Sequence, residues 1–553
     1  MNKKVCSFPI LFALLTLLIG TCAVVFPASA QAAPTATGSI TVSGTVASSY
    51  DAYQIFSANV VDGDSDAKIA TDLAWASDAV RDAALPVLHS AGMPNSQTTA
   101  QEAAEWLNAD SHLTSALSAQ LARSLQSSGA EPVALNAGTA AELSCGYWLI
   151  VADDDAIAQG EAGTAPIMAL VGGSAVTVKP KAATPKVAKH VLEDSTAAWQ
   201  KAADATVADD LYWRLSATVP AGLTAYDTYT VRFVDTMSAG LDPSKVAASM
   251  RVYAAAGADG GFDAVSCEGG NANSTPAKGW TDITSQCKVS VDGNAFTVRT
   301  GDLIAALGGA DAFAAGARVV AVYNAPLNSA CNHGIAKGNP NEVYLRYPRS
   351  PFADQSGDAG FTRTPSNDAC AYTWDLALTK RGSDGDKPLA GAVLSIVDDR
   401  GRTLAADGTW DAEGKATVTT GEDGRVTVSG VDSGKLEVRE LKAPKGYTAF
   451  EGTRSVTVKA EGLDVDQVAA AKPKLTITAE SPLRADSADG STGSLEASLI
   501  NTPTGTPPSI TTGGFMPSTG DMAMYAAAAA AVAGAALIVV ALLVKRGGGS
   551  HKE

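Results

Sequence analysis

The C-terminal third of the chain carries an amine at Lys380, a carboxyl group at Glu440 and a carboxamide at Asn501. If these groups met, the amine and the carboxamide could join in an amide bond with help from the carboxyl group. A lysine amine is a nucleophile only when it is neutral, and burial in an apolar core lowers its pKa because the charged form loses hydration. The same burial raises the pKa of a carboxyl group. A protonated carboxyl group can then polarise the carboxamide and relay protons to departing ammonia. This chemistry needs a packed core that holds the three groups in contact.

β-Strands are the elements that would position these groups. Between residues 373 and 502, runs such as GEDGRVTVSGV and GKLEVRELKAPKGYT alternate in polarity and are separated by Gly, Asp and Pro turns, which predicts a β-sandwich. A second strand-rich segment spans 181–372, with runs such as YTVRFVD and RVVAVYNAP. Together with the first domain, these patterns predict an all-β chain of tandem Ig-like sandwiches.

The first domain, residues 31–180, mixes two periodicities. Strands are predicted in 38–60, 145–153 and 166–180, whereas Ala, Leu and Trp recur at helical spacing between Lys68 and Leu125. Thr99-Ala100-Gln101-Glu102 has the form of a capping box and predicts a helix start. We therefore expect a sheet with a helical insertion.

The N-terminus has the features of an export signal. Two lysines precede an apolar region from Phe8 to Phe26 and the small-residue site Ala28-Ser29-Ala30. We expect residues 1–30 to be a signal peptide cut after Ala30, with Ala32 or Ala33 as alternatives. Removal of both predicted terminal signals takes the formal net charge from −17 to about −20. So acidic a surface argues against nucleic acid as a partner.

The C-terminus carries a motif, an apolar span and a basic tail in that order. The span from Met522 to Val544 has no charge and can cross a hydrocarbon core of ~30 Å. The motif Met516-Pro517-Ser518-Thr519-Gly520 resembles the LPXTG-type sortase signal of Gram-positive surface proteins, with Met in place of Leu. The resemblance implies that residues 516–553 are a sorting signal, cut after Thr519, whose carbonyl passes to an amine. An ordinary membrane anchor is the alternative. A Pro/Gly/Thr linker, 503–515, precedes the motif.

The third domain resembles a CnaB-type domain of Gram-positive pilins and adhesins. The resemblance rests on LTK at 378–380, PLAGA at 388–392, the E-box-like LEVRELKAPKGY at 436–447 and LIN at 499–501. It implies an isopeptide bond between Lys380 and Asn501, promoted by Glu440, that ties the first strand to the last. The reaction would occur once per chain, so the domain is not an enzyme in the turnover sense. A surface lysine, a salt-bridged glutamate and a turn asparagine are the alternative.

The middle domain resembles the isopeptide-forming second domain of fimbrial backbone proteins. PKVAKHV at 185–191 places the reactive amine at Lys189, VRFVDTMSAGL at 231–241 places the acid at Asp235, and NEVYLRY at 341–347 places the acceptor on a final strand at Asn341. The family commonly continues with Ser-Asn-Asn-Pro, whereas this chain has Pro348-Arg349-Ser350-Pro351. If the bonded asparagine belongs to that run, it is missing here.

The linker between the first two domains carries VTVKPK at 176–181, which resembles the pilin motif that usually ends in Tyr-Pro-Lys. In the family this lysine accepts the threonine carbonyl of the next subunit, through a pilus-specific sortase. The resemblance implies that Lys181 and Thr519 form the inter-subunit linkage. A solvated lysine without a partner is the alternative.

Cysteine, histidine and acidic patterns add no further site. Five cysteines remain after signal removal, and Cys267–Cys287 and Cys331–Cys370 are candidate bridges, with Cys145 left over. The acidic run Asp62-Gly63-Asp64-Ser65-Asp66 lacks the Glu that a calcium loop carries at its twelfth position, which is Leu73. We expect no cofactor and no metal.

These features predict a backbone pilin of a Gram-positive bacterium, exported, held by its apolar tail as a precursor and then attached covalently to the pilus and cell wall. The expected partners are a pilus-specific sortase, a housekeeping sortase, identical subunits, minor or tip pilins and peptidoglycan, with host receptors as further candidates. The alternative is a monomeric wall-anchored adhesin, in which Lys181 has no role.

Overall fold

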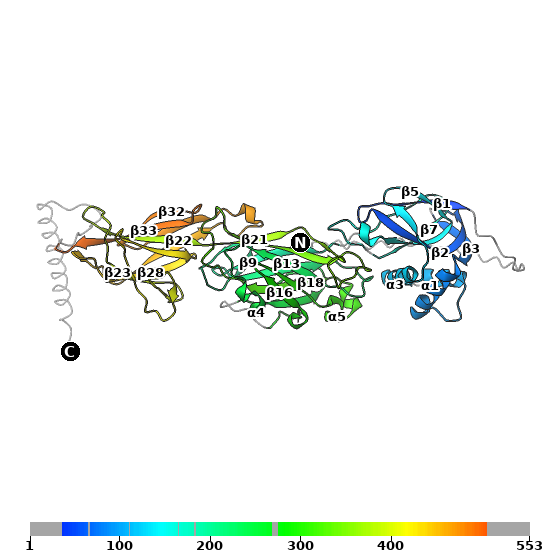
Figure 1. The fold of residues 1–553 in the computed structure, drawn as a ribbon, viewed down its shortest axis with the longest axis horizontal. Coiled ribbons are helices and arrows are strands. Elements are labelled where there is room, and N and C mark those ends of the chain that lie inside the picture. Colours follow the sequence, from blue (N-terminus) through cyan, green and yellow to red (C-terminus); the bar gives the residue numbers. More distant parts are fainter. Residues whose placement is uncertain are drawn as a thin grey trace, which may run out of the picture.

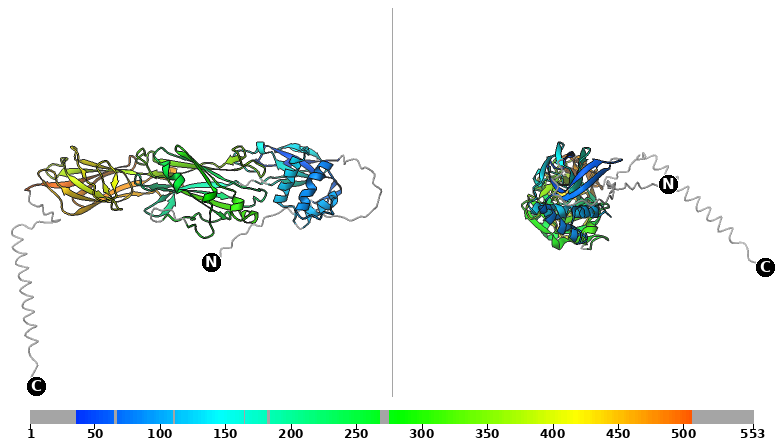
Figure 2. Two further views of the ribbon diagram at one scale, coloured as in Figure 1. Left: turned by 60° about the horizontal axis from the view of Figure 1, so that its bottom comes forward. Right: turned by 90° about the vertical axis from the view of Figure 1, so that its right-hand side faces the viewer.

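The computed structural model describes residues 36–64, 67–109, 111–163, 165–181, 184–267 and 275–505. Three β-rich bodies follow one another in a row, with the first at the right of Figure 1 and the third at the left. The end-on view of Figure 2 shows the bodies aligned along one axis. Within the described part of the chain, no helix is long and apolar enough to cross a membrane. The predicted signal peptide, most of the linker, the sorting motif and the apolar C-terminal span lie outside the described residues.

The first body contains two sheets and three helices. One sheet has the order β3-β2-β6-β7 with β4 beside β2, and the other has the order β5-β1-β8. The helices lie against one side of the larger sheet (Figure 1). The elements are β1 (Thr37–Val42), β2 (Ser49–Asp62), β3 (Lys68–Trp75), α1 (Asp78–Ser90), α2 (Ala100–Asn108), α3 (Ser115–Ser127), β4 (Val133–Asn136), β5 (Ala140–Ser144), β6 (Gly146–Ala152), η1 (Asp154–Ala156), β7 (Ile167–Val171) and β8 (Val176–Val178).

The helical insertion is confirmed, but it starts later than the sequence predicted. The capping box at Thr99 and Glu102 is present and opens α2. Residues 68–75, assigned above to the helical stretch, form strand β3, which pairs antiparallel with β2 and places Trp75 opposite Phe56. Cross-strand pairing outweighs the helical spacing there, because the exposed edge of β2 offers hydrogen-bond partners that a periodicity argument does not see.

The middle body is a sandwich of two sheets. One has the order β10-β9-β12-β18-β14-β15 and the other β11-β21-β19-β13-β17-β16, with β20 beside β19. The strands are β9 (Lys186–Glu193), β10 (Ala198–Gln200), β11 (Ala202–Asp204), β12 (Tyr212–Val219), β13 (Arg232–Met237), β14 (Arg251–Ala256), β15 (Thr281–Asp282), β16 (Lys288–Asp292), β17 (Ala295–Arg299), β18 (Ala317–Asn324), β19 (Asn339–Pro348), β20 (Phe361–Arg363) and β21 (Asn367–Tyr372). The short helices are η2 (Pro243–Lys245), α4 (Val246–Ser249), η4 (Thr284–Gln286), α5 (Leu303–Ala306) and α6 (Ala310–Phe313).

The strand that holds Asn341 is not the final strand of this sandwich. After β19, the segment with Arg349 turns toward the first body, and β20 and β21 then return to pair with β19. Arg349 Nη1 donates to the Asp154 carbonyl at 3.1 Å, and Gly163 N donates to the Arg349 carbonyl at 2.6 Å. The run that departs from the family pattern therefore contributes to the junction with the first body.

The third body is a sandwich with sheets ordered β27-β22-β33-β29, with β32 beside β33, and β25-β24-β23-β28-β30-β31, with β26 beside β23. Its elements are β22 (Trp374–Gly382), β23 (Val393–Val397), β24 (Thr403–Leu404), β25 (Trp410–Asp411), β26 (Val418–Thr419), β27 (Arg425–Val431), β28 (Gly434–Lys442), β29 (Tyr447–Thr448), β30 (Thr453–Glu461), η5 (Val468–Ala470), β31 (Lys474–Ala479), β32 (Leu483–Asp489) and β33 (Ser494–Pro503). The fold class predicted from the sequence, tandem β-sandwiches with a helical insertion in the first, is confirmed.

Candidate functional site

The third domain brings together all three side chains predicted from its sequence. Strands β22 and β33, the first and last of the sandwich, pair in parallel with Lys380 opposite Leu499. Asn501 therefore lies two residues further along the same inward face, because side chains alternate with period two. Glu440 projects from β28 in the facing sheet. The side chains of Lys380 and Glu440 are both fully buried.

Hydrogen bonds join these three groups inside the core. Lys380 Nζ lies 3.5 Å from Glu440 Oε1 and donates to the Leu499 carbonyl at 3.3 Å. Asn501 Nδ2 donates to the two carboxyl oxygens of Glu440 at 2.9 and 3.0 Å. Asn501 Oδ1 is buried and has no hydrogen-bond partner among the described residues. The acid thus contacts both nitrogens that an amide exchange would involve.

Burial sets the protonation state of the amine. It lowers the pKa of Lys380 from 10.5 to about 8, because the ammonium form loses its hydration, while the neighbouring Glu440 opposes the shift. A neutral amine is therefore accessible at physiological pH. The arrangement can attack the carboxamide carbon and pass a proton to the departing nitrogen through Glu440.

The middle domain also assembles its three predicted residues, one from one sheet and two from the facing sheet. Lys189 lies on β9, whereas Asp235 and Asn341 lie on β13 and β19 of the opposite sheet. All three are fully buried. Lys189 Nζ contacts Asp235 Oδ2 directly. The pairing of β13 with β19, which puts Met237 opposite Asn341, holds the acid and the carboxamide on neighbouring strands.

The titration of this pair is shifted toward the neutral forms. Burial lowers the pKa of Lys189 from 10.5 to about 8 and raises the pKa of Asp235 from 3.8 to about 6. In each case the opposite charge of the partner acts against the larger effect of burial. Aromatic rings surround the amine, with Lys189 Nζ 5.6 Å from the ring centre of Trp213. A neutral amine beside a protonated acid is the combination that amide formation requires.

One residue of the middle cluster was missed by the sequence analysis. The hydroxyl of Tyr323, on β18, contacts Lys189, Asp235 and Asn341. Period-two spacing puts Tyr323 on the same face as Val319 and Ala321, which line the central core, but the opposite face of this strand is apolar too, so the sequence did not show which face points inward. No motif marked it as more than a core aromatic.

The predicted linkage residues differ in what the structure says about them. Lys181 follows β8 by three residues and is exposed in the connection between the first and middle bodies. The Val178 carbonyl just before it accepts a hydrogen bond from Ser43 N at 2.8 Å, so the motif begins on an ordered strand. Thr519 and the rest of the sorting motif, Met516 to Gly520, lie outside the described residues.

The two predicted disulfides are not formed, and all five cysteines that the structure describes are free. Cys287 packs against the central core of the middle sandwich, whereas Cys267 packs on the outer face of its six-stranded sheet. Cys331 and Cys370 likewise belong to different cores, those of the middle and third bodies. These pairs were candidates because an exported protein can form disulfides, but a disulfide also needs Cβ atoms about 4 Å apart.

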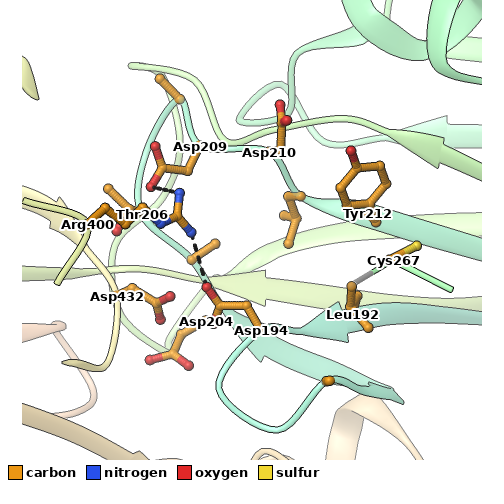
Figure 3. Close-up of a pocket in the computed structure, with 14 residues that line it drawn as sticks. Leu192, Asp194, Asp204, Thr206, Asp209, Asp210, Tyr212, Cys267, Arg400 and Asp432 are labelled. Atoms are coloured by element: carbon orange, nitrogen blue, oxygen red, sulfur yellow. Dashed lines mark hydrogen bonds and ion pairs between the residues drawn. The ribbon is translucent and has the colours of Figure 1, made fainter. Parts of the chain in front are cut away.

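A pocket of about 730 Å³ at the junction of the middle and third bodies is lined by carboxylates (Figure 3). Arg400 of the third body pairs with Asp209 at 2.7 Å and with Asp194 at 3.3 Å, both from the middle body. Below them, Asp204 accepts from Trp374 Nε1 at 2.7 Å and from Ser433 N at 3.0 Å. These contacts hold the two bodies together and surround a group of crowded acids.

This junction should make stability depend on pH. Burial, together with the charge of Asp204, raises the pKa of Glu193 from 4.5 to about 7. Because the folded-state pKa exceeds the unfolded one, the stabilisation is complete below about pH 4.5 and is lost as pH rises through about 7. Glu193→Gln should flatten this dependence and stabilise the protein at pH 8 by on the order of 2 kcal/mol. Urea unfolding measured from pH 5 to 8 checks this.

The control for this variant is Glu422→Gln, which alters an exposed acid of the third body. It should leave the pH dependence of the wild-type chain unchanged. A Glu193→Gln chain whose unfolding free energy falls with pH as steeply as that of the wild type would show that Glu193 does not titrate in this range.

The fold and the two buried clusters define a class of protein: tandem β-sandwiches in which a lysine of the first strand meets an acid and an asparagine inside the core. Residues 375–472 match the family model of the SpaA domain, described as a prealbumin-like fold domain. The trypsin-resistant surface T6 protein of Streptococcus pyogenes serotype M6 is 30% identical over 143 residues. That match covers 24% of this chain and 24% of the relative, so the chain matches about a quarter of that protein's length.

Solved structures of Gram-positive pilins are also similar to this chain. The T6 backbone pilin of S. pyogenes is 17% identical, with a TM-score of 0.46, and the match covers 86% of this chain and 100% of that one. The full-length major pilin SpaD of Corynebacterium diphtheriae is 15% identical, with a TM-score of 0.41 and coverage of 84% and 98%. Together with the SpaA domain match, the sequence relative bears out the predicted resemblance to sortase-assembled backbone pilins.

Proposed function

We propose that this chain is the structural backbone subunit of a covalent pilus on the surface of a Gram-positive bacterium. The observation that carries the proposal is the pair of sealed clusters, each joining a lysine, an acid and an asparagine inside a sandwich. Autocatalytic isopeptide bonds, Lys380–Asn501 and Lys189–Asn341, would form there once per chain. The domains are taken as 31–180, 181–372 and 373–502.

The positions of these bonds suit a subunit that carries tension. In the third domain, force enters at Trp374, which begins β22, and leaves at the other end of the body where β33 ends, because the two strands run parallel. A covalent bond between Lys380 and Asn501 carries this load directly. The hydrogen bonds of the roughly 120 residues between them then carry none of the pulling force. In the middle domain a Lys189–Asn341 bond shields the chain between these residues in the same way.

Polymerisation would join the connection between the first and middle bodies of one subunit to the segment that follows the third body of another. Lys181 is exposed on the connection after the first body, where a sortase active site can reach its amine. The last described strand, β33, ends at the far end of the row (Figure 1), and the sorting motif follows it in the sequence. In the proposal, a pilus-specific sortase joins Thr519 of one subunit to Lys181 of the next, and a housekeeping sortase attaches the fibre to peptidoglycan. Minor or tip pilins and host receptors are further partners of such a fibre.

A denaturing gel of cell-wall extracts tests the assembly. The wild-type chain should give a ladder of very large species, because the subunits are joined by amide bonds that detergent does not break. Thr519→Ala should abolish both the ladder and wall attachment, leaving the chain in the membrane fraction.

The conservative variant Thr519→Ser, which keeps the side-chain hydroxyl of the motif, is the matched control for Thr519→Ala. A single wild-type band released from the wall would favour the monomeric adhesin, and normal wall attachment of Thr519→Ala would refute the sorting-signal assignment.

A further inference from the structure

The hydroxyl of Tyr323 occupies the centre of the middle cluster. Tyr323 Oη accepts from Lys189 Nζ at 2.9 Å and from Asn341 Nδ2 at 2.9 Å, and it donates to Asp235 Oδ2 at 3.2 Å. These three contacts use its one donor and both acceptor sites. The ring is fixed by the edge of Phe296, with ring centroids 4.7 Å apart. The hydroxyl is therefore held between the attacking and the departing nitrogen.

In the third domain, the acid alone contacts both the lysine nitrogen and the asparagine nitrogen. There Glu440 touches the nitrogens of both Lys380 and Asn501, and no tyrosine hydroxyl is hydrogen-bonded to any of the three within the described residues. In the middle domain the acid is an aspartate, which is one methylene shorter. Its contact with the carboxamide nitrogen runs through Tyr323. The tyrosine hydroxyl thus fills the place that the longer glutamate side chain reaches by itself.

We propose that Tyr323 is a catalytic residue of amide formation in the middle domain, where its hydroxyl carries the proton from the nitrogen of Lys189 to the departing nitrogen of Asn341. The inference rests on the proposed function, namely that the Lys189–Asn341 bond forms. It adds a fourth reacting group to that site and predicts that the two isopeptide sites of one chain use different proton routes.

The reaction balances with these four groups. The neutral Lys189 Nζ forms a bond to Asn341 Cγ, the carbonyl electron pair moves to Oδ1, and Oδ1 takes the proton of the Asp235 acid. Tyr323 then gives its hydroxyl proton to Nδ2 and takes one from Nζ. The Cγ–Nδ2 bond breaks, ammonia leaves, and the proton on Oδ1 returns to Asp235 as the carbonyl re-forms. Acid and tyrosine are regenerated, and no other reactant is consumed.

Two further observations fit this route. Asp235 Oδ1 and Asn341 Oδ1 are both buried without a hydrogen-bond partner in the described part of the chain. A proton on Asp235 Oδ1 would supply the donor that these two acceptors lack. Burial also raises the pKa of Tyr323 well above its ordinary value, so the phenol stays neutral and can relay a proton without accumulating as phenolate.

Intact-mass measurement of the full exported chain, residues 31–519, tests the role of Tyr323. The wild-type chain should lack the mass of two ammonia molecules, one from each site, and peptide mapping should locate both cross-links. Tyr323→Phe retains the ring and removes only the hydroxyl. The variant should form the third-domain bond normally. The middle-domain bond should form at least ~100-fold more slowly than in the wild type, because general acid–base groups have effects of this size.

Tyr347→Phe is the matched control, because it deletes another buried hydroxyl of the same domain, one that donates to the Gly160 carbonyl at 2.8 Å. It should form both bonds at the wild-type rate. A Tyr323→Phe chain that forms the middle bond as fast as the wild type overturns the proposal and leaves the isopeptide site itself intact. A wild-type chain that lacks only the third-domain ammonia overturns both the middle-domain bond and the role of Tyr323.

A second variant guards against a Tyr323→Phe chain that is simply misfolded. In the double variant Asp235→Glu/Tyr323→Phe, the longer acid should reach the carboxamide nitrogen directly, as Glu440 does. Recovery of the middle-domain bond to at least ten times the rate of Tyr323→Phe supports the relay, because a structural role of the hydroxyl would not be replaced by a carboxyl group. A protease-resistant double variant that stays unbonded overturns the proposal.

Discussion

Replacing Lys181 by alanine is expected to abolish the covalent ladder completely while leaving export of the monomer intact. The reason is chemical: only a primary amine can accept the threonyl group, and Lys181 is exposed on the connection after β8, where it is accessible to another protein's active site. The variant removes no buried contact, so the folded subunit should persist. Immunoblots of wall extracts after denaturing electrophoresis measure the result.

Two neighbouring lysines provide the controls for this variant. Lys179 and Lys186 are also exposed and flank the same connection, so Lys179→Ala and Lys186→Ala should polymerise as the wild type does. A ladder that persists in Lys181→Ala but disappears in one of these two would move the acceptor to that residue. A ladder that persists in all three variants would show that none of these three lysines is the required acceptor.

Glu440→Ala should restore the mass of one ammonia to the exported chain and should lower the stability of the third domain by several kcal/mol. A bond between Lys380 and Asn501 closes a loop of ~120 residues and reduces unfolded-state entropy by ~4–5 kcal/mol in the loop-closure model used for disulfides. Loss of the acid also leaves Asn501 Nδ2 without its buried acceptor, at a further ~1–3 kcal/mol. Intact mass and thermal unfolding measure the two effects separately.

The same chain offers matched comparisons for this prediction. Glu437→Ala removes a glutamate of the same strand whose side chain is 46% exposed and pairs with Lys435, so it should keep the bond and change stability little. Lys380→Ala and Asn501→Ala should each lack the third-domain cross-link. If the tryptic peptides of the wild-type third domain carry no Lys380–Asn501 link, the E-box residues pack in the core but promote no bond.

Much of the site could be predicted from sequence because the chemistry depends on residue types in a fixed strand order. Lys380, Glu440 and Asn501 were located by short motifs that resemble those of CnaB-type domains. The tandem sandwiches and the helical insertion with its capping box followed from patterns within single elements. These features are local, so no knowledge of distant contacts was needed.

What the sequence could not determine depends on pairs of residues far apart in the chain. Residues 68–75 carry helical spacing but form β3, because β2 offers an edge to pair with. Cys331 and Cys370 were a candidate bridge in an exported chain, yet they lie in different cores. Asn341 lies on β19, which two further strands follow, since the segment around Arg349 leaves the sandwich to contact the first body.

Tyr323 illustrates the division most clearly. The sequence alone predicted only that it lies in a strand-rich run. Only the packing of the two sheets brought its hydroxyl to within 2.9 Å of Lys189 Nζ, a residue 134 positions earlier in the chain. Local alternation determines which face a side chain takes, because it follows from the backbone of one strand. Which groups meet across the core depends on the register and stacking of sheets, which many distant residues determine together.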